Sequence, residues 1–243
     1  MQFPDETPHR LQRAEAVLQR RTSRLVLILE RPWNDENVQA VLRTAESFGI
    51  QHVWTIKHPH MRGRAQRKVT KGSHRWLTRR FFGEISECVA AAREEGLELW
   101  ATDLDDGALE LKGPEVLRPF PDRVGLIMGR EMAGISDELR AATARQIYLP
   151  MHGFTESFNL SVAAALVIQR CFDAEPGLVG AMGDQERSEL RRKWFGRLAG
   201  KNESKREAFV KMADSGVTPL ETTRPSSESR TPRIKKSMDG YFD

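Results

Sequence analysis

The chain has 243 residues, and its 38 lysines and arginines against 34 aspartates and glutamates give a formal net charge of +4. Hydrophobic residues make up 39% of the sequence, enough for one sizeable core, and only two cysteines are present, too few for a disulfide framework. The longest apolar run, 162–168, is too short to span a bilayer, and the N-terminus has no apolar signal segment. These features predict a cytoplasmic protein with no membrane partner and with two buried thiols.

The charge is unevenly placed along the chain. Residues 62–80 carry eight lysines and arginines and no acid, so the rest of the chain sums to 4 − 8 = −4. A basic stripe on an acidic-to-neutral body favours a polyanionic partner that binds at one place. This basic stripe, residues 62–80, contains glycines and no long apolar run, which predicts mostly loop.

An amphipathic helix is predicted over residues 7–22. One face carries apolar residues at spacings of three and four: Leu11, Ala14, Val17 and Leu18. Four arginines lie off that face: Arg10, Arg13, Arg20 and Arg21. They can be a solvated surface or a second basic contact, and the sequence favours neither.

Strands and helices then alternate. Apolar runs predict strands over residues 24–30, 52–56, 97–102, 124–128 and 146–149. Helical periodicity predicts helices over 37–48, 84–95, 137–144 and 158–172, the first two ended by Gly49 and Gly96 and the third capped by Ser136. This alternation predicts an α/β fold with a mainly parallel sheet and helices on both faces.

The chain beyond Pro176 changes in character. Residues 184–211 are charged and could be helical, and from Ser215 onward Ser, Thr, Pro, Arg and Lys dominate, which predicts disorder. Arg191, Arg192 and Lys193 could assist in binding a polyanion or could simply be solvated. We therefore expect four segments: a basic helix (1–22), the main domain (23–175), a charged helical extension (176–214) and a tail (215–243).

Three strand-to-helix loops carry candidate chemistry, because ligands of α/β sheets bind at the carboxyl ends of strands. In the first, Asn37 at the helix N-cap and Arg43 could point towards one end of the sheet; a capping Asn and a surface Arg are the plainer interpretation. In the second, residues 128–134, glycines allow close approach of a ligand to the backbone. In the third, residues 149–161, a polar cluster can form a helix cap or the floor of a pocket.

Nucleotide-binding signatures of the common kinds are absent from these loops. There is no phosphate-loop Gly-Lys-Ser/Thr sequence and no Gly-x-Gly-x-x-Gly. His58-x-His60 and the acidic run 103–106 are weak metal candidates, because a loop pair without further ligands is usually incidental and the acidic run resembles a solvated turn.

Together the three loops resemble the signature motifs of the SpoU (TrmH) family of RNA ribose 2′-O-methyltransferases, in the SPOUT superfamily. The first motif matches as Asn37…Arg43-Thr44-Ala45, the second as residues 127–131 with Gly134, and the third as residues 149–151 with 157–165. The resemblance covers residues 25–172, and residues 72–76 and 100–104 are similar to the tRNA-acting branch. Arg130 and Phe158 depart from the residues common at their positions.

The resemblance implies the fold, the cofactor and the assembly. Members have an α/β sheet with a deep C-terminal trefoil knot, bind S-adenosylmethionine in the knot without a metal, and are homodimers whose active site is completed across the interface. By position, the cofactor contacts are expected at Thr102, Gly129, Leu149, Pro150, Phe158 and Leu160.

The resemblance also assigns catalytic roles. Arg43 corresponds to the family's catalytic arginine, and it can act as a base or bind the target phosphate and orient the hydroxyl. Four residues are expected to hold Arg43 and the knot loops: Asn37, Glu131, Ser157 and Asn159. The ribose 2′-hydroxyl makes RNA, not DNA, the substrate.

The leading hypothesis is therefore a tRNA methyltransferase, acting on guanosine 18 of the D-loop. Alternatives are a ribosomal RNA ribose methyltransferase, whose relatives often carry an extra N-terminal RNA-binding domain, and a non-catalytic RNA-binding module. RNA contacts are expected at Arg10, Arg13, Arg64, Lys68, Lys71 and Arg75.

Overall fold

The computed structural model describes residues 7–58, 73–105, 107–130 and 133–221. Contacts divide the chain into two units, residues 18–190 and residues 1–17 with 191–243. Each unit is described by itself. The larger unit contains the sheet and all three motif loops.

Within the described residues, seven strands form one sheet in the order β3-β2-β1-β6-β4-β7-β5, and every neighbouring pair is parallel. Their bounds are β1 Thr22–Glu30, β2 Ile50–Ile56, β3 Thr78–Phe82, β4 Glu98–Thr102, β5 Leu109–Glu110, β6 Val124–Met128 and β7 Arg145–Tyr148. Because all the strands run the same way, their carboxyl ends meet at one edge of the sheet. The fold is the predicted α/β class with a parallel sheet.

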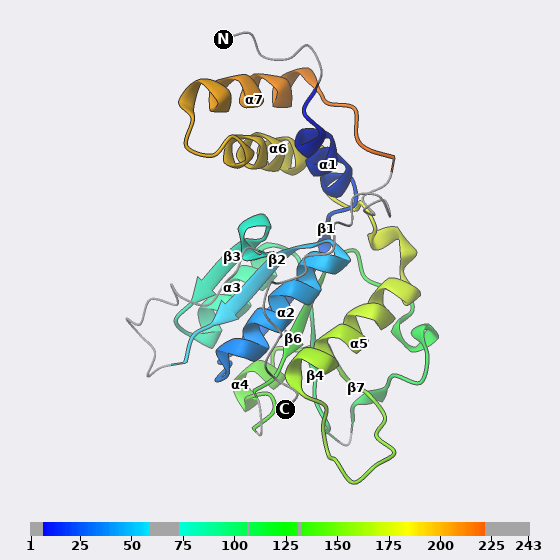
Figure 1. Ribbon diagram of the computed structural model, residues 1–243. Coiled ribbons are helices and arrows are strands. Elements are labelled where there is room, and N and C mark those ends of the chain that lie inside the picture. Colours follow the sequence, from blue (N-terminus) through cyan, green and yellow to red (C-terminus); the bar gives the residue numbers. More distant parts are fainter. Residues whose placement is uncertain (1–6, 59–72, 106, 131–132, 222–243) are drawn as a thin grey trace, which may run out of the picture. The chain divides into compact units, whose positions relative to one another are not determined.

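Helices cover both faces of the sheet (Figure 1). The strand β1 shows why its sequence is continuously apolar. Leu25, Leu27 and Leu29 point to the face covered by α2 (Asp35–Phe48) and α5 (Leu160–Ala174). Val26 and Ile28 point to the face covered by α3 (Ile85–Glu94) and α4 (Asp137–Arg140). The trefoil knot that the resemblance implies stays a prediction.

The helices α2 and α5 run side by side in the same direction (Figure 1). Their first turns are joined by a hydrogen bond between Asn159 and Asn37, and near their ends the rings of Phe48 and Phe172 lie 5.6 Å apart between centroids. This pairing brings the first and third motifs together although they are 122 residues apart in sequence.

The N-cap expected at Asn37 is wrong. Asn34 caps α2, because its side-chain oxygen accepts hydrogen bonds from the amides of Glu36 and Asn37 at 2.7 and 3.3 Å. The predicted stop at Gly49 is confirmed: its φ is 83°, and a Cβ there would lie 2.8 Å from the carbonyl oxygen of Arg20. Ser136 does occupy the N-cap of α4, but its side chain makes no capping hydrogen bond.

Two strands were missed by sequence reasoning. The end of the basic stripe was expected to be loop, yet residues 78–82 form β3, an edge strand that pairs with β2. A 3₁₀ turn, η2 (Ser73–Trp76), precedes it. The strand has two adjacent arginines, which hide its alternation, and it is stabilised by pairing with β2 and by Phe82 packing into the core. The two-residue strand β5 is too short to leave a pattern.

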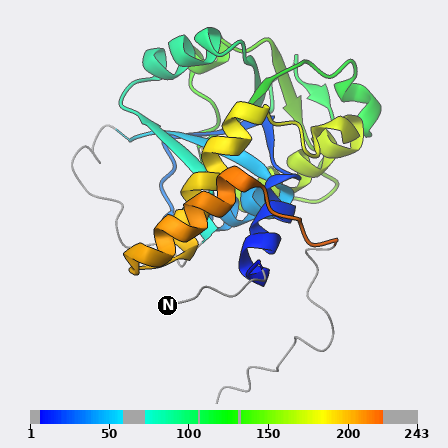
Figure 2. The ribbon, with the colours of Figure 1, turned by 90° about the horizontal axis from the view of Figure 1, so that it is seen from above.

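The smaller unit contains most of α1 (His9–Leu18), the second half of α6 (Asp184–Leu198) and α7 (Glu203–Ser215). The charged stretch expected to be helical is two helices, broken at Gly200, whose φ is 73°. The helix α7 returns alongside the second half of α6, where Gly196 approaches Arg206 (Figure 2).

A buried ion pair joins α1 to α6 within this unit. The guanidinium of Arg191 donates to both oxygens of Glu15, at 2.6 and 2.8 Å, and the side chain of Glu15 is 4% exposed. Arg191, which the sequence offered as a possible polyanion contact, therefore forms an intramolecular ion pair. None of the helices in the described parts of the chain is long and apolar enough to cross a membrane.

Candidate active site

A cavity of about 670 Å³ opens at the carboxyl edge of the sheet. Its walls come from the ends of β4, β6 and β7 and from the start of α5. This is the place where parallel α/β sheets bind ligands. Five of the six expected cofactor residues line it: Thr102, Gly129, Leu149, Phe158 and Leu160. Pro150 is adjacent in the chain but does not line the cavity.

The loop after β6 is closed on itself. The amide of Arg130 donates to the carbonyl of Gly134 at 3.0 Å, and the amide of Gly134 donates back at 3.1 Å. Gly134 has a φ of 59°, and a Cβ on Gly129 would lie 3.0 Å from the carbonyl carbon of Gly134. Glycines are thus required for the loop to pack this closely. The side chain of Arg130 also donates to the Gly134 carbonyl, at 3.2 Å, and lines the cavity.

Asn159 performs both roles that the sequence left open. Its side-chain oxygen accepts hydrogen bonds from the amide and the hydroxyl of Ser161, at 2.9 and 2.7 Å, and so caps α5. Its side-chain nitrogen donates to the Asn37 oxygen at 3.0 Å, and the residue lines the cavity together with Ser157. The cap therefore also forms part of the cavity wall.

The single chain does not bring Arg43, the predicted catalytic arginine, to the cavity. It is exposed on α2 and does not line the cavity. It lies six residues beyond Asn37, about 9 Å further along the helix axis. Asn37 itself contacts the cavity wall through Asn159.

Charged residues around the cavity that sequence reasoning missed fix its walls. Glu30 ends the apolar run of β1 and is completely buried, and it accepts from the amide of Ser136 at 3.1 Å. Arg140 of α4 contacts Asp103 at 3.0 Å and Asp105 at 2.8 Å. Asp103 and Asp105, which were expected to lie in a solvated turn, are therefore paired with α4, and Asp103 lines the cavity. A carboxylate at the end of an apolar strand was the available signal for Glu30.

Three of the residues expected to contact RNA are exposed. Arg75 is exposed in η2, and Arg10 and Arg13 are exposed on α1. Glu131, Arg64, Lys68, Lys71 and His60 lie outside the described residues. Among the residues that the structure describes, no group of three or more His, Cys, Asp or Glu side chains could hold a metal ion.

Both cysteines are free and buried, as expected. Burial raises the pKa of each thiol, Cys88 and Cys171, to about 12. Neither lines the cavity, and neither is suited to be a nucleophile near neutral pH.

Comparison with known proteins matches this chain to a family and to solved folds. The SpoU rRNA Methylase family matches residues 24–169. The tRNA (guanosine(18)-2′-O)-methyltransferase of Escherichia coli strain K12 is 32% identical over 161 residues, 66% of this chain and 68% of that protein. The protein of the same name from Borreliella burgdorferi is 28% identical over 193 residues, 78% of this chain and 85% of its own.

The solved structure of the A. aeolicus TrmH/SpoU tRNA modifying enzyme has a similar fold. Its TM-score is 0.66 at 23% identity, and the similarity covers 76% of this chain and 94% of that chain.

Proposed function

The chain belongs to the SpoU rRNA Methylase family, and we propose that it methylates a ribose 2′-hydroxyl of tRNA, at guanosine 18 of the D-loop, with S-adenosylmethionine as donor. The observation that carries this proposal is the hydrogen bond between Asn37 and Asn159, which joins two signature motifs at the wall of a cavity lined by the second and third. The relatives named as tRNA (guanosine(18)-2′-O)-methyltransferases support the substrate.

The cavity fits a nucleoside-bearing methyl donor. Its volume lies within the usual ~300–1,000 Å³ of small-ligand sites. Leu149, Phe158 and Leu160 offer an apolar slot, and the glycine-bearing loop after β6 lets backbone groups approach a ligand. When bound, the donor supplies an electrophilic methyl group on a sulfonium, which needs no metal.

The chain's own residues then bind and orient the RNA. We assign Arg43 to the phosphate of the target nucleotide, which would hold the 2′-hydroxyl in line with the methyl group, because positioning can supply much of the barrier reduction. A role as base would need an unusual environment, since guanidinium groups are effectively always protonated. Asn37, Ser157 and Asn159 hold the motif loops in place, and Glu131 is proposed to do the same.

We further propose that the active form is a homodimer. Arg43 is exposed and does not line the cavity of its own chain, and exposed apolar side chains recur every four residues from just before α5 to its middle. These are Phe158, Val162 and Leu166, which are 39, 44 and 41% exposed. A second copy that covers this stripe would supply its Arg43 to the cavity.

Complementation tests the shared site. An Arg43→Ala chain and a chain with a blocked cavity, Gly129→Val, would each be inactive alone. Refolded together in equal amounts, they should recover about a quarter of wild-type turnover, because half of the dimers are mixed and each has one intact site. No recovery from a mixture shown to form mixed dimers would place Arg43 and the cavity of one chain in the same site.

We propose that the basic stripe binds the phosphates of the tRNA backbone. Replacing Lys68, Lys71 and Arg75 by Gln should weaken tRNA binding and flatten its dependence on salt, by about one unit of slope for each phosphate that is no longer neutralised. If the salt dependence of tRNA binding were unchanged, other cations would have to bind the phosphates. Arg10 and Arg13 provide a second set to test, because both are exposed on α1.

Mapping the modified nucleotide tests the function as a whole. The protein is incubated with labelled S-adenosylmethionine and with bulk tRNA or ribosomal RNA, and the 2′-O-methylated nucleotide is located by mass spectrometry. Methylation of guanosine 18 supports the proposal, and methylation of ribosomal RNA alone would move the substrate to the ribosome. RNA binding without any transfer would indicate a non-catalytic module.

A further inference from the structure

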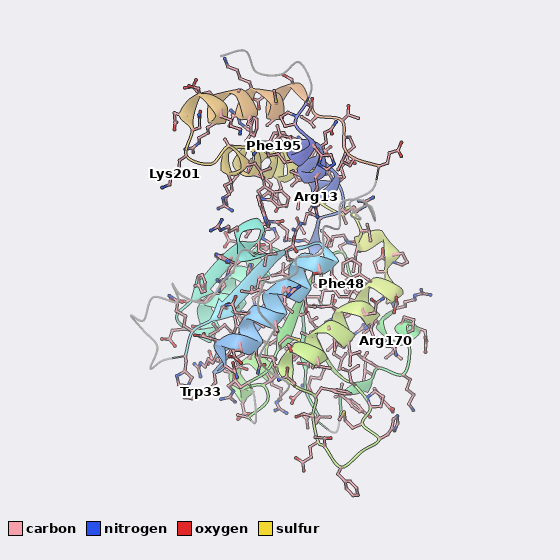
Figure 3. The ribbon with its side chains drawn as sticks, in the orientation of Figure 1. Arg13, Trp33, Phe48, Arg170, Phe195 and Lys201 are labelled. Carbon is pink, nitrogen blue, oxygen red and sulfur yellow. The ribbon has the colours of Figure 1, made fainter. Side chains whose placement is uncertain are left out.

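Two exposed aromatic side chains lie near the carboxyl ends of β1 and β3, and a partly buried histidine follows β2. Trp33, in the loop after β1, is 59% exposed and lies beside the first turn of α2 (Figure 3). Its ring centroid is 4.3 Å from that of His58, which follows β2. Phe81, near the end of β3, is 40% exposed, with the Lys57 ammonium 5.4 Å and the Arg79 guanidinium 4.6 Å from its ring centroid. We define these five residues as the aromatic row.

The loop that carries Trp33 is fixed at both ends. The amide of Arg31 donates to the carbonyl of Ile56 at 2.9 Å, and Arg31 has a φ of 41°, a left-handed conformation that costs free energy in a residue other than glycine. Pro32 is buried, and Asn34 is tied into the cap of α2. The backbone on both sides of Trp33 is therefore held in place while 59% of the residue stays exposed.

The chemistry of the row suits an unpaired nucleobase. Every base has a face that stacks on aromatic rings, and lysine or arginine beside the ring attracts the neighbouring phosphate. Asp35 and Glu36 are exposed on the first turn of α2, next to Trp33. They would repel a phosphate, so we assign the base to Trp33 and the phosphates to the cations at Phe81. Paired RNA hides its base faces and would not bind in this way.

The row is within reach of a nucleotide held at the cavity. The strand β1 is the neighbour of β6, whose end lines the cavity, and β2 is the next strand outward. With neighbouring strands ~4.8 Å apart, β2 lies roughly 10 Å and β3 roughly 14 Å from β6. These spans correspond to about three and about four stacked nucleotides at ~3.4 Å each.

We propose that the aromatic row stacks unpaired bases that flank the target nucleotide, and so positions single-stranded RNA for methyl transfer. The proposal rests on the proposed function for its substrate class, since it takes the polymer to be RNA. It adds Trp33 and Phe81 as positioning residues outside the three motifs.

Kinetics of separate variants test the positioning role. Trp33→Leu and Phe81→Leu should each raise KM for tRNA about fivefold or more, with unchanged binding of S-adenosylmethionine. Trp33→Phe keeps a stacking face and should stay within about twofold of wild type. Val179→Ser, an exposed apolar residue beyond α5, is the control for surface change. An unchanged KM in both leucine variants, or equal effects of Trp33→Leu and Trp33→Phe, would overturn the proposal.

A binding measurement without turnover separates this inference from the proposed function. Oligouridylate should quench tryptophan fluorescence of the wild type more than that of Trp33→Phe, whereas duplex RNA of equal length should quench both alike. This readout holds even if tRNA is never methylated. No difference between the two proteins would refute stacking at Trp33. If the leucine variants changed the sedimentation of the protein but not its RNA binding, the row would be a protein interface and the proposal would be wrong.

Discussion

Asn159 is the residue whose replacement separates the stability of the site from its function. Its side-chain oxygen caps α5, and its side-chain nitrogen reaches Asn37 at 3.0 Å. Alanine removes both interactions. Serine keeps a capping oxygen but is too short to reach Asn37, so the pair Asn159→Ala and Asn159→Ser isolates the link between α2 and α5.

The magnitudes follow from the two interactions. Loss of the cap costs about 1 kcal/mol, and loss of an exposed side-chain hydrogen bond costs about 0.5–1 kcal/mol. Asn159→Ala should therefore lower the free energy of unfolding by about 1.5–2 kcal/mol, which is roughly 3–8 °C in Tm for a unit of this size. Asn159→Ser should lose only about 0.5–1 kcal/mol, since serine and asparagine cap equally well.

Activity should not follow stability in these variants. Methyl transfer at saturating donor and tRNA should fall about tenfold in both, because both lose the bond that orients the first motif against the third. Thermal unfolding and labelled-methyl transfer measured on the same preparations check this. Wild-type turnover in Asn159→Ser would refute the role of the bond, and wild-type stability in Asn159→Ala would refute the cap.

Three further predictions concern other parts of the larger unit. Arg43→Ala should reduce methyl transfer by at least about a hundredfold, while the binding of S-adenosylmethionine, measured by calorimetry, is unchanged. Near-normal turnover would show that Arg43 is not needed for methyl transfer. Gly129→Ala should weaken donor binding by about tenfold or more, because its Cβ would press on the backbone of the loop that follows. An unchanged Kd for S-adenosylmethionine in a calorimetric titration would contradict this. Burial raises the pKa of Glu186, but hydrogen bonds from His52 and Ser23, together with the nearby charges of His52 and Arg123, outweigh it and bring the pKa below its ordinary value. The stability that these interactions supply is present above the unfolded carboxyl pKa and is lost as pH falls through the lower pKa of the folded state, so Glu186→Gln should cost about 1 kcal/mol at neutral pH and flatten the acid unfolding curve.

The sequence predicts the fold well wherever hydrophobic periodicity reports burial on both faces. The run from Leu25 to Leu29 is apolar without a break because alternate residues pack under different helix pairs. The strand β3 lacks this signal, since an edge strand needs only one buried residue near its end, Phe82. Local capping is similarly uncertain from sequence, and Asn34 forms the cap that Asn37 was expected to form.

The motifs predicted the residues that each loop contributes to the candidate site, but not the contacts between different loops. Gly129 and Leu149 line the cavity because the ends of parallel strands meet at one edge. Arg140 of α4 pairs at 3.0 Å with Asp103, which follows β4, and no local sequence pattern predicts this contact. The buried Glu30 likewise depends on the start of α4, where the amide of the N-cap Ser136 donates to one of its oxygens.

The position of Arg43 links the proposed dimer to the predicted behaviour of Asn159. Arg43 lies on α2, and the apolar stripe proposed to bind a second copy begins beside the cavity and continues along α5. The bond between Asn37 and Asn159 ties these two helices at their first turns. If Arg43 of one chain enters the cavity of the other, the orientation of α2 relative to α5 determines the position of Arg43 in that cavity. A small loss of orientation would then reduce transfer strongly while the fold keeps most of its stability, because the helices also pack along their length up to Phe48 and Phe172.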